Sequence, residues 1–390
     1  MFRKTIFWIH LSCGVVAGLV ILMMSVTGVL LTYERQMLAW VDRDLYVEAP
    51  SAGAKRLSAE ALLDAVRAQD PAFTPSSISF QVDPRAPVAL AAGRADSRNV
   101  NPYTGEVLPE AASRLHAFFD TMTGWHRWFN VSDENRDSAR AITGASNLMF
   151  LFLVLSGMYL WLPPIYRWAA FRARLVFNPK AQSSKARDFN WHHVVGIWSA
   201  IPLVVIVASA TVFNYDWADN LVYRIAGEEP PPPRGGPASA RPAPESPAAS
   251  RNAMPLDRLI ARAAAEVPGW RKLTLTLPVG GAAAEFTLDR GNGGQPQYRQ
   301  DLTLAAATGD IVESTPFSSV SPGRQARSML RFLHTGEALG IAGQTIAGIV
   351  SATSAVMVWT GISLAWRRLI SPFFRRRRLA GAREEISDAA

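Results

Sequence analysis

The sequence has a single cysteine, Cys13, among its 390 residues. One thiol can form no intrachain disulfide, and metal sites built from several thiolates are excluded. The sequence also shows no phosphate-binding glycine loop, no dinucleotide-binding glycine turn, no serine-nucleophile motif and no HExxH zinc motif. No NAD(P)H- or flavin-binding domain is therefore predicted, and no catalytic side chain is indicated.

Charged residues are missing from four long stretches of the chain. These stretches cover residues 5–33, 141–166, 189–215 and 338–366 and are 29, 26, 27 and 29 residues long. A helix needs about 20 residues to cross about 30 Å of hydrocarbon, and a buried soluble helix would be shorter and would carry a polar face. The sequence therefore predicts four transmembrane helices. The first is expected to be a retained anchor, because its apolar core is too long for a signal peptide.

Positive charge is concentrated in the segments that four spans would leave on one side of the membrane. Residues 1–4, 167–188 and 367–390 carry fifteen Lys and Arg and only four acids, although the whole chain has a net charge of +8. Positive charge marks the cytoplasmic side. Both termini, the loop 167–188 and the basic tail 367–390 are therefore expected in the cytoplasm, with segments 34–140 and 216–337 outside. The excess of basic residues is then explained by the membrane topology, and no nucleic-acid partner is predicted.

Each outer segment predicts a small α+β domain. In segment 34–140, a helix capped by Ser58 precedes strands near 77–82 and 88–92. The amphipathic stretch 114–130 predicts an interfacial helix or an outer extension of the second span.

The other outer segment, 216–337, contains a linker at 229–250. This linker is rich in proline and has no other apolar residue larger than alanine, so we expect it to be extended and disordered. Residues 255–313 then repeat the pattern of a helix and two strands.

The two halves of the chain align at constant offsets. An offset of 182 superposes the first and third spans, with His10 on His192, and an offset of 204 superposes the second and fourth spans and the Thr-Gly turns at Thr104 and Thr308. The sequence thus predicts a mainly α-helical membrane protein built by tandem duplication of span, outer domain and span. Its parallel halves would be related by a pseudo-twofold axis along the membrane normal.

His10 and His192 are expected one to two helical turns inside the cytoplasmic side of the membrane. A histidine within a membrane span indicates a functional site by default. Two imidazoles related by the twofold axis can both face that axis and can supply the two axial ligands of a haem iron. His193, next to His192 and about 100° around the helix, is the alternative ligand if the third span is rotated.

His126 and His334 form a second predicted pair, near the outer face. They precede Gly144 and Gly348 by 18 and 14 residues, so a four-residue insertion makes them equivalent. We expect them at the outer ends of the second and fourth spans. His116 is a spare histidine that could be an alternative ligand or could contact a substrate.

Other interpretations of these residues stay open. Each histidine could cap a helix or bond a buried carbonyl group, and histidine alone could bind zinc. A second pair at the opposite membrane depth favours two b-type haem groups that form an electron path. Tyr33 and Tyr215 are typical interface anchors, but both could also line a substrate entrance near the outer pair.

Several short motifs recur in a fixed order along the chain. They are His-x3-Gly at His10 and His192, Tyr-Thr-Gly-Glu-Val at Tyr103, Ser-Gly-Met-Tyr-Leu-Trp at Ser156, Thr-Gly-Asp-Ile-Val at Thr308 and Leu-His-Thr-Gly at Leu333. The pattern resembles the PepSY-associated transmembrane family of bacterial inner-membrane proteins, over nearly the whole chain apart from the linker and the tail. The resemblance implies two periplasmic PepSY-like domains and a multi-pass protein of the inner membrane. His193 departs from the family, which more often has another residue there.

The resemblance also implies a function in iron uptake. It implies an oxidoreductase with two haem b groups that reduces a periplasmic ferric siderophore, of the hydroxamate type, and releases Fe(II). The electron donor would be a membrane quinol or another partner. The alternatives are a di-haem quinol-linked protein with another acceptor, and a haem-free membrane protein whose outer domains bind or regulate a periplasmic partner.

Overall fold

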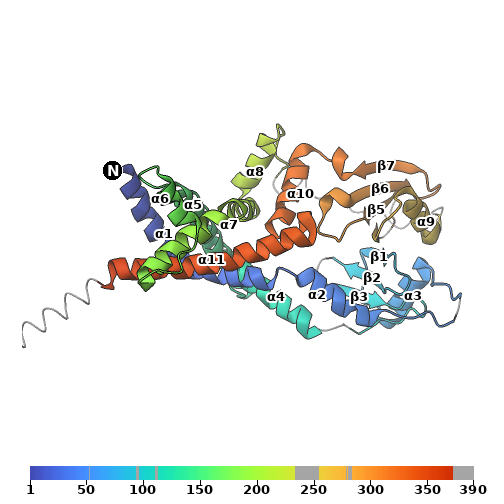
Figure 1. The fold of residues 1–390 in the computed structure, drawn as a ribbon. Helices are drawn as coiled ribbons and strands as arrows, with labels where there is room; N and C mark the ends of the chain where they lie inside the picture. Colours follow the sequence, from blue (N-terminus) through green and yellow to red (C-terminus); the bar gives the residue numbers. More distant parts are fainter. Residues whose placement is uncertain are drawn as a thin grey trace, which may run out of the picture.

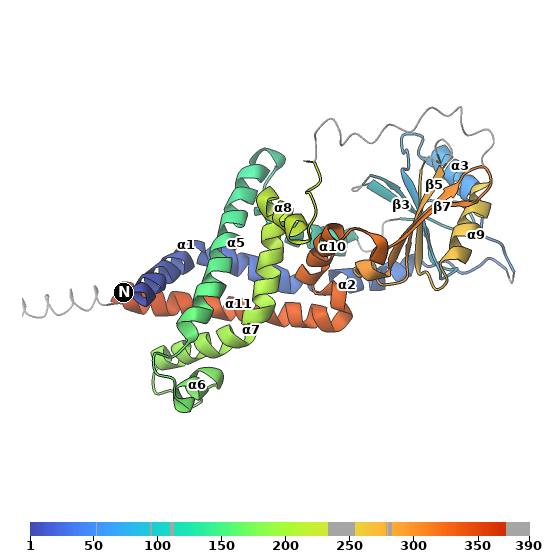
Figure 2. The ribbon, with the colours of Figure 1, turned by 90° about the horizontal axis from the view of Figure 1, so that it is seen from above.

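The computed structural model describes residues 1–51, 53–93, 96–109, 113–232, 254–277, 279 and 283–371. The molecule is elongated, with a bundle of long helices at one end and a β-sheet domain at the other (Figures 1 and 2). The basic tail from residue 372 onward and most of the predicted linker lie outside the described residues.

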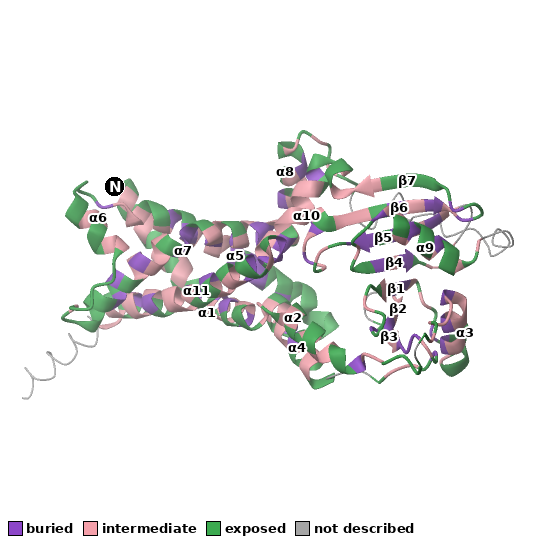
Figure 3. Cartoon of the chain, turned by 45° about the vertical axis from the view of Figure 1, so that its right-hand side comes forward, coloured by how far each residue is buried: buried purple, intermediate pink, exposed green. Residues whose placement is uncertain are grey.

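Four long helices form the bundle: α1 (Phe2–Leu30), α5 (Asp133–Trp161), α7 (Ser184–Asn214) and α11 (Gly340–Leu369). Each contains an apolar stretch long enough to cross a membrane. Their outward sides stay exposed (Figure 3), with large apolar residues such as Val16, Ile201 and Trp359. An apolar surface of this extent is typical of a helix face that contacts lipid.

The four bundle helices pack as a ring. Helix α1 contacts α5 and α11, and α7 contacts the same two neighbours, so α1 and α7 lie at opposite corners. The interior at mid-height is a cluster of buried apolar side chains, Val154, Leu203, Val207 and Val350. The start of α1, the end of α11 and the short helix α6 (Trp168–Leu175) lie at the bundle end remote from the sheet (Figures 1 and 2).

The sheet domain contains one antiparallel sheet of seven strands in the order β3-β2-β1-β4-β5-β6-β7. The strands are β1 (Ser77–Gln81), β2 (Val88–Ala92), β3 (Asp96–Val100), β4 (Lys272–Thr276), β5 (Ala283–Asp289), β6 (Arg299–Ala305) and β7 (Ile311–Pro316). Helices α3 (Ala59–Gln69) and α9 (Leu256–Glu266) supply apolar side chains to the same core. Fully buried leucines such as Leu273 and Leu302 contribute about 1.5–3 kcal/mol each.

The two outer segments share this sheet, whereas the sequence predicted two separate domains. Strands β1 and β4, one from each segment, pair over five residues from Ser77–Thr276 to Gln81–Lys272. This pairing joins the two apolar faces into one core, so neither half leaves an open strand edge at the junction. The Thr-Gly turn at Thr308 leads into β7, but the turn at Thr104 follows β3, and Val107 makes only an isolated bridge to Val100.

The helices of the two halves also cap one another. The Ser58 hydroxyl caps α3 as predicted, accepting from the Ala61 N–H at 3.1 Å. The Ala59 N–H donates to the Asp257 carboxylate of α9 at 2.9 Å, and the Leu256 N–H donates to the Glu60 carboxylate of α3. Each helix thus satisfies an N-terminal donor of the other, which is worth about 1 kcal/mol per cap.

Short helices connect the bundle to the sheet. They are α2 (Glu34–Val41), the 3₁₀ helix η1 (Asp42–Leu45), α4 (Ser113–Trp128), α8 (Asp216–Ile225), η4 (Pro296–Tyr298), η5 (Phe317–Ser319), α10 (Pro322–His334) and η6 (Glu337–Leu339). Helices α4 and α10 are separate elements that fold back on the bundle before α5 and α11 begin. The predicted placement of His126 and His334 on the ends of the second and fourth spans is therefore wrong.

Tight reversals of the chain make α4 and α10 separate. After α4, Phe129 and Asn130 adopt φ values of 54° and 52°, in the left-handed region that non-glycine residues rarely occupy. After α10, Gly336 has φ 77°, and a Cβ there would collide with the Gly343 carbonyl oxygen. Both reversals bring a short helix back against the bundle, with a histidine at or near its end.

Candidate functional site

Two pairs of histidines lie at the two ends of the helix bundle. We call His126 and His334, on the side of the sheet, the outer histidine pair. His10 of α1 and His192 of α7, at the other end, form the inner histidine pair. The ring centres of the outer histidine pair lie 6.3 Å apart. Two imidazoles on opposite sides of one metal ion have centres roughly 6–6.5 Å apart, since each metal–nitrogen bond is about 2.0–2.1 Å.

Hydrogen bonds fix the tautomer of both outer imidazoles. His334 Nδ1 lies 2.9 Å from the Ile206 carbonyl oxygen, which can only accept, so Nδ1 carries the proton. His126 Nδ1 lies 2.9 Å from Thr27 Oγ1. Because the Thr27 hydroxyl already donates to the Met23 carbonyl oxygen at 2.7 Å, it accepts from His126. In both rings the Nε2 lone pair is free to bind a metal.

Burial also favours the neutral form of both outer imidazoles. Burial, with a smaller contribution from His334, lowers the pKa of His126 to about 4. Burial likewise lowers the pKa of His334 below its ordinary value. A metal competes only with protons for a histidine nitrogen, so a depressed pKa leaves the Nε2 ligand available throughout the neutral range.

The Nδ1 hydrogen bonds recur at the inner histidine pair, with hydroxyls from two other helices. His10 Nδ1 lies 2.8 Å from Ser156 Oγ of α5, and His192 Nδ1 lies 2.9 Å from Thr360 Oγ1 of α11. Both hydroxyls donate to a carbonyl oxygen four residues earlier in their own helix, at 2.6 and 2.9 Å. They therefore accept from Nδ1–H, and the Nε2 atoms of the inner imidazoles are free. His10 and His192 are close enough to interact electrostatically.

Glycines pack directly against the inner imidazoles. A Cβ at Gly157 would lie 3.5 Å from His10 Cε1, and one at Gly361 would lie 3.4 Å from His192 Cε1. Gly14 and Gly196, the glycines of the two His-x3-Gly motifs, face Leu153 and the methyl group of Met357 instead. They serve the packing of neighbouring spans, which is the common role of small residues in membrane helices.

The hydroxyl residues that orient the imidazoles were missed in the sequence. Their signal was present: Thr27 and Ser209 are 182 residues apart, and Ser156 and Thr360 are 204 residues apart, the same offsets that align the spans. Ser209 Oγ lies 3.3 Å from His334 Nδ1. Thr27 Oγ1 makes the corresponding contact with His126 Nδ1 at 2.9 Å. A search for polar residues that recur at both offsets would have found them.

The two pairs are separated along the bundle axis. Thr27 follows His10 by seventeen residues in one continuous helix, and Ser209 follows His192 by seventeen, a rise of about 25 Å. The buried cluster around Val154 and Val207 fills the bundle between them. The interior between the pairs is therefore apolar at this height.

His193 and His116 are directed elsewhere. His193 Nδ1 donates to the Phe189 carbonyl oxygen at 2.8 Å, and its ring packs on the Phe189 ring with centres 4.1 Å apart. His116 Nε2 lies 3.3 Å from the Asp42 carboxylate. The geometry therefore favours His192 over His193 at the inner pair and engages His116 in a contact with η1.

Tyr33 and Tyr215 tie bundle helices together. The Tyr33 hydroxyl bonds Thr345 Oγ1 of α11 at 2.7 Å, and a Cβ at Gly144 of α5 would lie 3.1 Å from the Tyr215 hydroxyl. These contacts are consistent with anchoring at the bundle end near the sheet. Their role at a substrate entrance stays a prediction.

Within the described part of the chain, no group of three or more His, Cys, Asp or Glu side chains gathers around one point. Zinc sites use three or four protein ligands. The arrangement of isolated imidazole pairs therefore suits a metal whose remaining positions are filled by a cofactor better than it suits a zinc ion.

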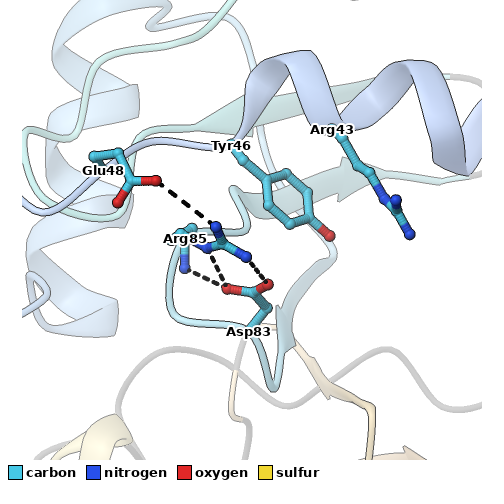
Figure 4. A pocket seen from close by; sticks show the side chains of 5 residues that line it. All are labelled: Arg43, Tyr46, Glu48, Asp83 and Arg85. Carbon is cyan, nitrogen blue, oxygen red and sulfur yellow. Dashed lines mark hydrogen bonds and ion pairs between the residues drawn. The ribbon is translucent and has the colours of Figure 1, made fainter.

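A polar hollow of about 600 Å³ lies beside the sheet domain (Figure 4). It is lined by Arg43, Tyr46, Glu48, Asp83 and Arg85. Its charges are mostly paired: Arg85 contacts Asp83 at 3.1 Å and Glu48 at 3.7 Å, and the Arg85 hydrogen bonds lower the pKa of Asp83. None of the four paired histidines lines it.

The fold and the site define a multi-pass membrane protein with two histidine pairs and one sheet domain, to which both outer segments contribute strands. The chain matches the family described as PepSY-associated TM region over residues 7–368. It therefore belongs to the PepSY-associated TM family. No curated protein sequence matches it.

Proposed function

We propose that the protein is a di-haem b reductase of the bacterial inner membrane that passes electrons to a periplasmic ferric siderophore. The observation that carries this proposal is the geometry of the two histidine pairs, which lie about 25 Å apart along the bundle axis with all four Nε2 lone pairs free. Imidazole pairs of this kind would hold a haem iron through their Nε2 atoms, and the haem would supply a one-electron carrier.

In this proposal His10 and His192 hold one haem, and His126 and His334 hold the other. A bound haem supplies a one-electron carrier at each position. The chain's own residues do the rest: the hydroxyls of Thr27, Ser156 and Thr360 and the Ile206 carbonyl hold the imidazole tautomers, and the apolar interior keeps water away. The matching contacts at both offsets also support a duplicated architecture.

The sidedness of the reaction follows from charge. The described parts of the basic segments lie at the bundle end remote from the sheet, so the positive-inside rule favours a cytoplasmic location for that end and a periplasmic location for the sheet domain. A membrane quinol releases two electrons and two protons on oxidation. Each ferric siderophore takes up one electron, and its Fe(III) becomes Fe(II), which hydroxamate ligands bind far less tightly.

The choice of a siderophore as acceptor rests on family resemblance. The motif order is similar in particular to that of the ferrioxamine siderophore reductase FoxB, a two-haem protein. A ferric hydroxamate such as ferrioxamine B is therefore the first acceptor to test.

The proposed activity is tested by re-oxidation of the reduced protein. Ferrioxamine B, added without oxygen to the protein reduced by stoichiometric dithionite, is expected to restore the oxidised spectrum and to release one Fe(II) per electron, trapped by ferrozine. The gallium complex is the control, because it has the same shape but accepts no electron. A reduced haem protein that ferrioxamine B leaves unchanged would identify a redox protein with another acceptor.

The orienting hydroxyls give a second prediction. Ser156→Ala and Thr360→Val remove the acceptor of Nδ1–H at the inner histidine pair, and loss of such a partner typically weakens metal binding by about 10- to 100-fold. Haem titration of the apo-protein measures the effect. Ser25→Ala is the matched control, because the buried Ser25 hydroxyl donates only to the Ile21 carbonyl of its own helix. Equal affinities in all three variants would contradict the orienting role.

A further inference from the structure

Four arginines gather beside the outer histidine pair. Arg127 of α4 lies within electrostatic range of Arg140 and Arg136 of α5 and of Arg331 of α10. We call these four residues the arginine cluster. Arg127 adjoins His126 in the sequence, and Arg331 precedes His334 by three residues, which places both on one side of α10. The cluster therefore lies beside the outer pair, with Arg127 within electrostatic range of His126.

Most of this positive charge has no counter-charge from the protein. Arg136 forms an ion pair with Asp133 at 2.7 Å. For Arg127, Arg140 and Arg331, no carboxylate of the described residues lies within ion-pair distance. Such an arrangement is stabilised when an anion binds between the cations.

Stacking on aromatic rings restrains these guanidinium groups. The Arg127 and Arg136 guanidinium carbons both lie 4.8 Å from the centre of the Trp128 ring, and that of Arg331 lies 5.8 Å from the Phe332 ring. A restrained planar guanidinium is suited to bidentate binding of a carboxylate.

The inner histidine pair lacks this feature in the described contacts. Arg3 donates to the Leu160 and Leu162 carbonyl oxygens at 2.7 Å each, and Arg174 donates to the Trp161 carbonyl oxygen. These two arginines cap the end of α5. Arg368, whose guanidinium carbon lies 4.6 Å from the centre of the Phe7 ring, is a single stacked arginine near His10, whereas four arginines gather beside the outer pair.

We propose that the arginine cluster binds carboxylates, and that these are the two propionate groups of the haem held by His126 and His334. This inference rests on the proposed function, because it assigns a second set of contacts to the same cofactor. The propionates lie at one edge of the porphyrin and need cationic or hydrogen-bonding partners when they leave water. Arg127 and Arg331 lie next to the two ligands and are the chief partners.

The test uses the full chain carrying His10→Ala and His192→Ala, so that only the outer pair can bind. Apo-protein is titrated with haemin and with haemin dimethyl ester, in which both carboxylates are blocked. We expect haemin to bind more tightly than the ester, and Arg127→Gln with Arg331→Gln to weaken haemin binding by roughly 10- to 100-fold per arginine while leaving ester binding unchanged. The midpoint potential of the haem should also fall, because loss of positive charge favours the oxidised form.

Two further variants control for folding and for unspecific charge. Arg127→Lys with Arg331→Lys keeps the charge and should recover part of the preference for haemin. Arg324→Gln removes an exposed arginine ten residues before His334 in the same helix and should change nothing.

The outcomes distinguish two anions that the cluster could bind, the haem propionates and an anionic ferric chelate. Equal binding of haemin and its ester by the unmodified cluster would overturn the inference while leaving the haem reductase intact. Unchanged haem binding in the Gln variants, together with slower re-oxidation by an anionic ferric chelate, would assign the cluster to the substrate and also overturn it. A protein that binds neither porphyrin would overturn this inference together with the proposed function.

Discussion

Replacing His126 or His334 with alanine is expected to leave the protein with one haem instead of two. The two rings are 6.3 Å apart and come from separate helices, α4 and α10, so removal of either leaves a single axial ligand. The free Nε2 of the remaining imidazole cannot fill both positions. The pyridine haemochrome content per chain should fall to about half, and ferrioxamine B should no longer re-oxidise the reduced protein at a comparable rate.

His116→Ala is the matched control for the outer pair. His116 lies in the same helix as His126, but its Nε2 contacts Asp42. Its replacement should leave both haems in place. Loss of a haem from His116→Ala, with both haems retained in His126→Ala, would contradict the assignment of the outer ligands.

Replacing His10 or His192 with alanine is expected to remove the other haem. These residues are held by hydroxyls on α5 and α11 at 2.8 and 2.9 Å, and they lie about 25 Å from the outer pair along the axis. The remaining haem should keep its own spectrum, and it should still be re-oxidised by a ferric siderophore after chemical reduction. Reduction by a membrane quinol should be lost, because the inner position is nearest to the proposed donor.

His193→Ala is the control that distinguishes the two neighbouring histidines. The His193 ring packs on Phe189 and donates to its carbonyl oxygen. The variant should retain both haems, with the spectrum of each unchanged. If His193→Ala lost the inner haem and His192→Ala kept it, His193 would be the ligand, and the third span would be rotated about its axis.

The membrane helices were predictable because their physical requirement is simple. A bilayer demands a long apolar stretch with its backbone groups satisfied internally, and the four charge-free runs meet that demand. Their ends were not predictable to the residue: α5 begins at Asp133, eight residues before its charge-free run. Polar residues continue a helix readily once it has left the hydrocarbon region.

Long-range pairing was the part of the fold that the sequence concealed. Strands β1 and β2 were expected close to where they lie, and β4 and β5 fall within residues 255–313, where two strands were expected. The pairing of β1 with β4 joins residues almost 200 positions apart, and no local pattern specifies which strand edges meet. The separate helices α4 and α10 were concealed for a related reason, since Phe129 and Asn130 make a left-handed reversal without a glycine to announce it.

The candidate site was half visible in the sequence. The offset of 182 singled out His10 and His192, because histidines at equal depth in two spans are rare. Their hydroxyl partners were concealed because serine and threonine are common in membrane helices. Only the combination of two offsets, 182 and 204, distinguishes Ser156 and Thr360 from the other hydroxyl residues.

The absorption spectrum of the detergent-purified protein, recorded before and after dithionite with a haem count per chain, tests the central claim most directly. Two bis-histidine haems predict a sharp Soret band, resolved α and β bands on reduction, and about two haems per chain. A colourless protein, produced with ample haem supply and correctly folded, would contradict the account and would direct attention to the sheet domain as the functional part of the molecule.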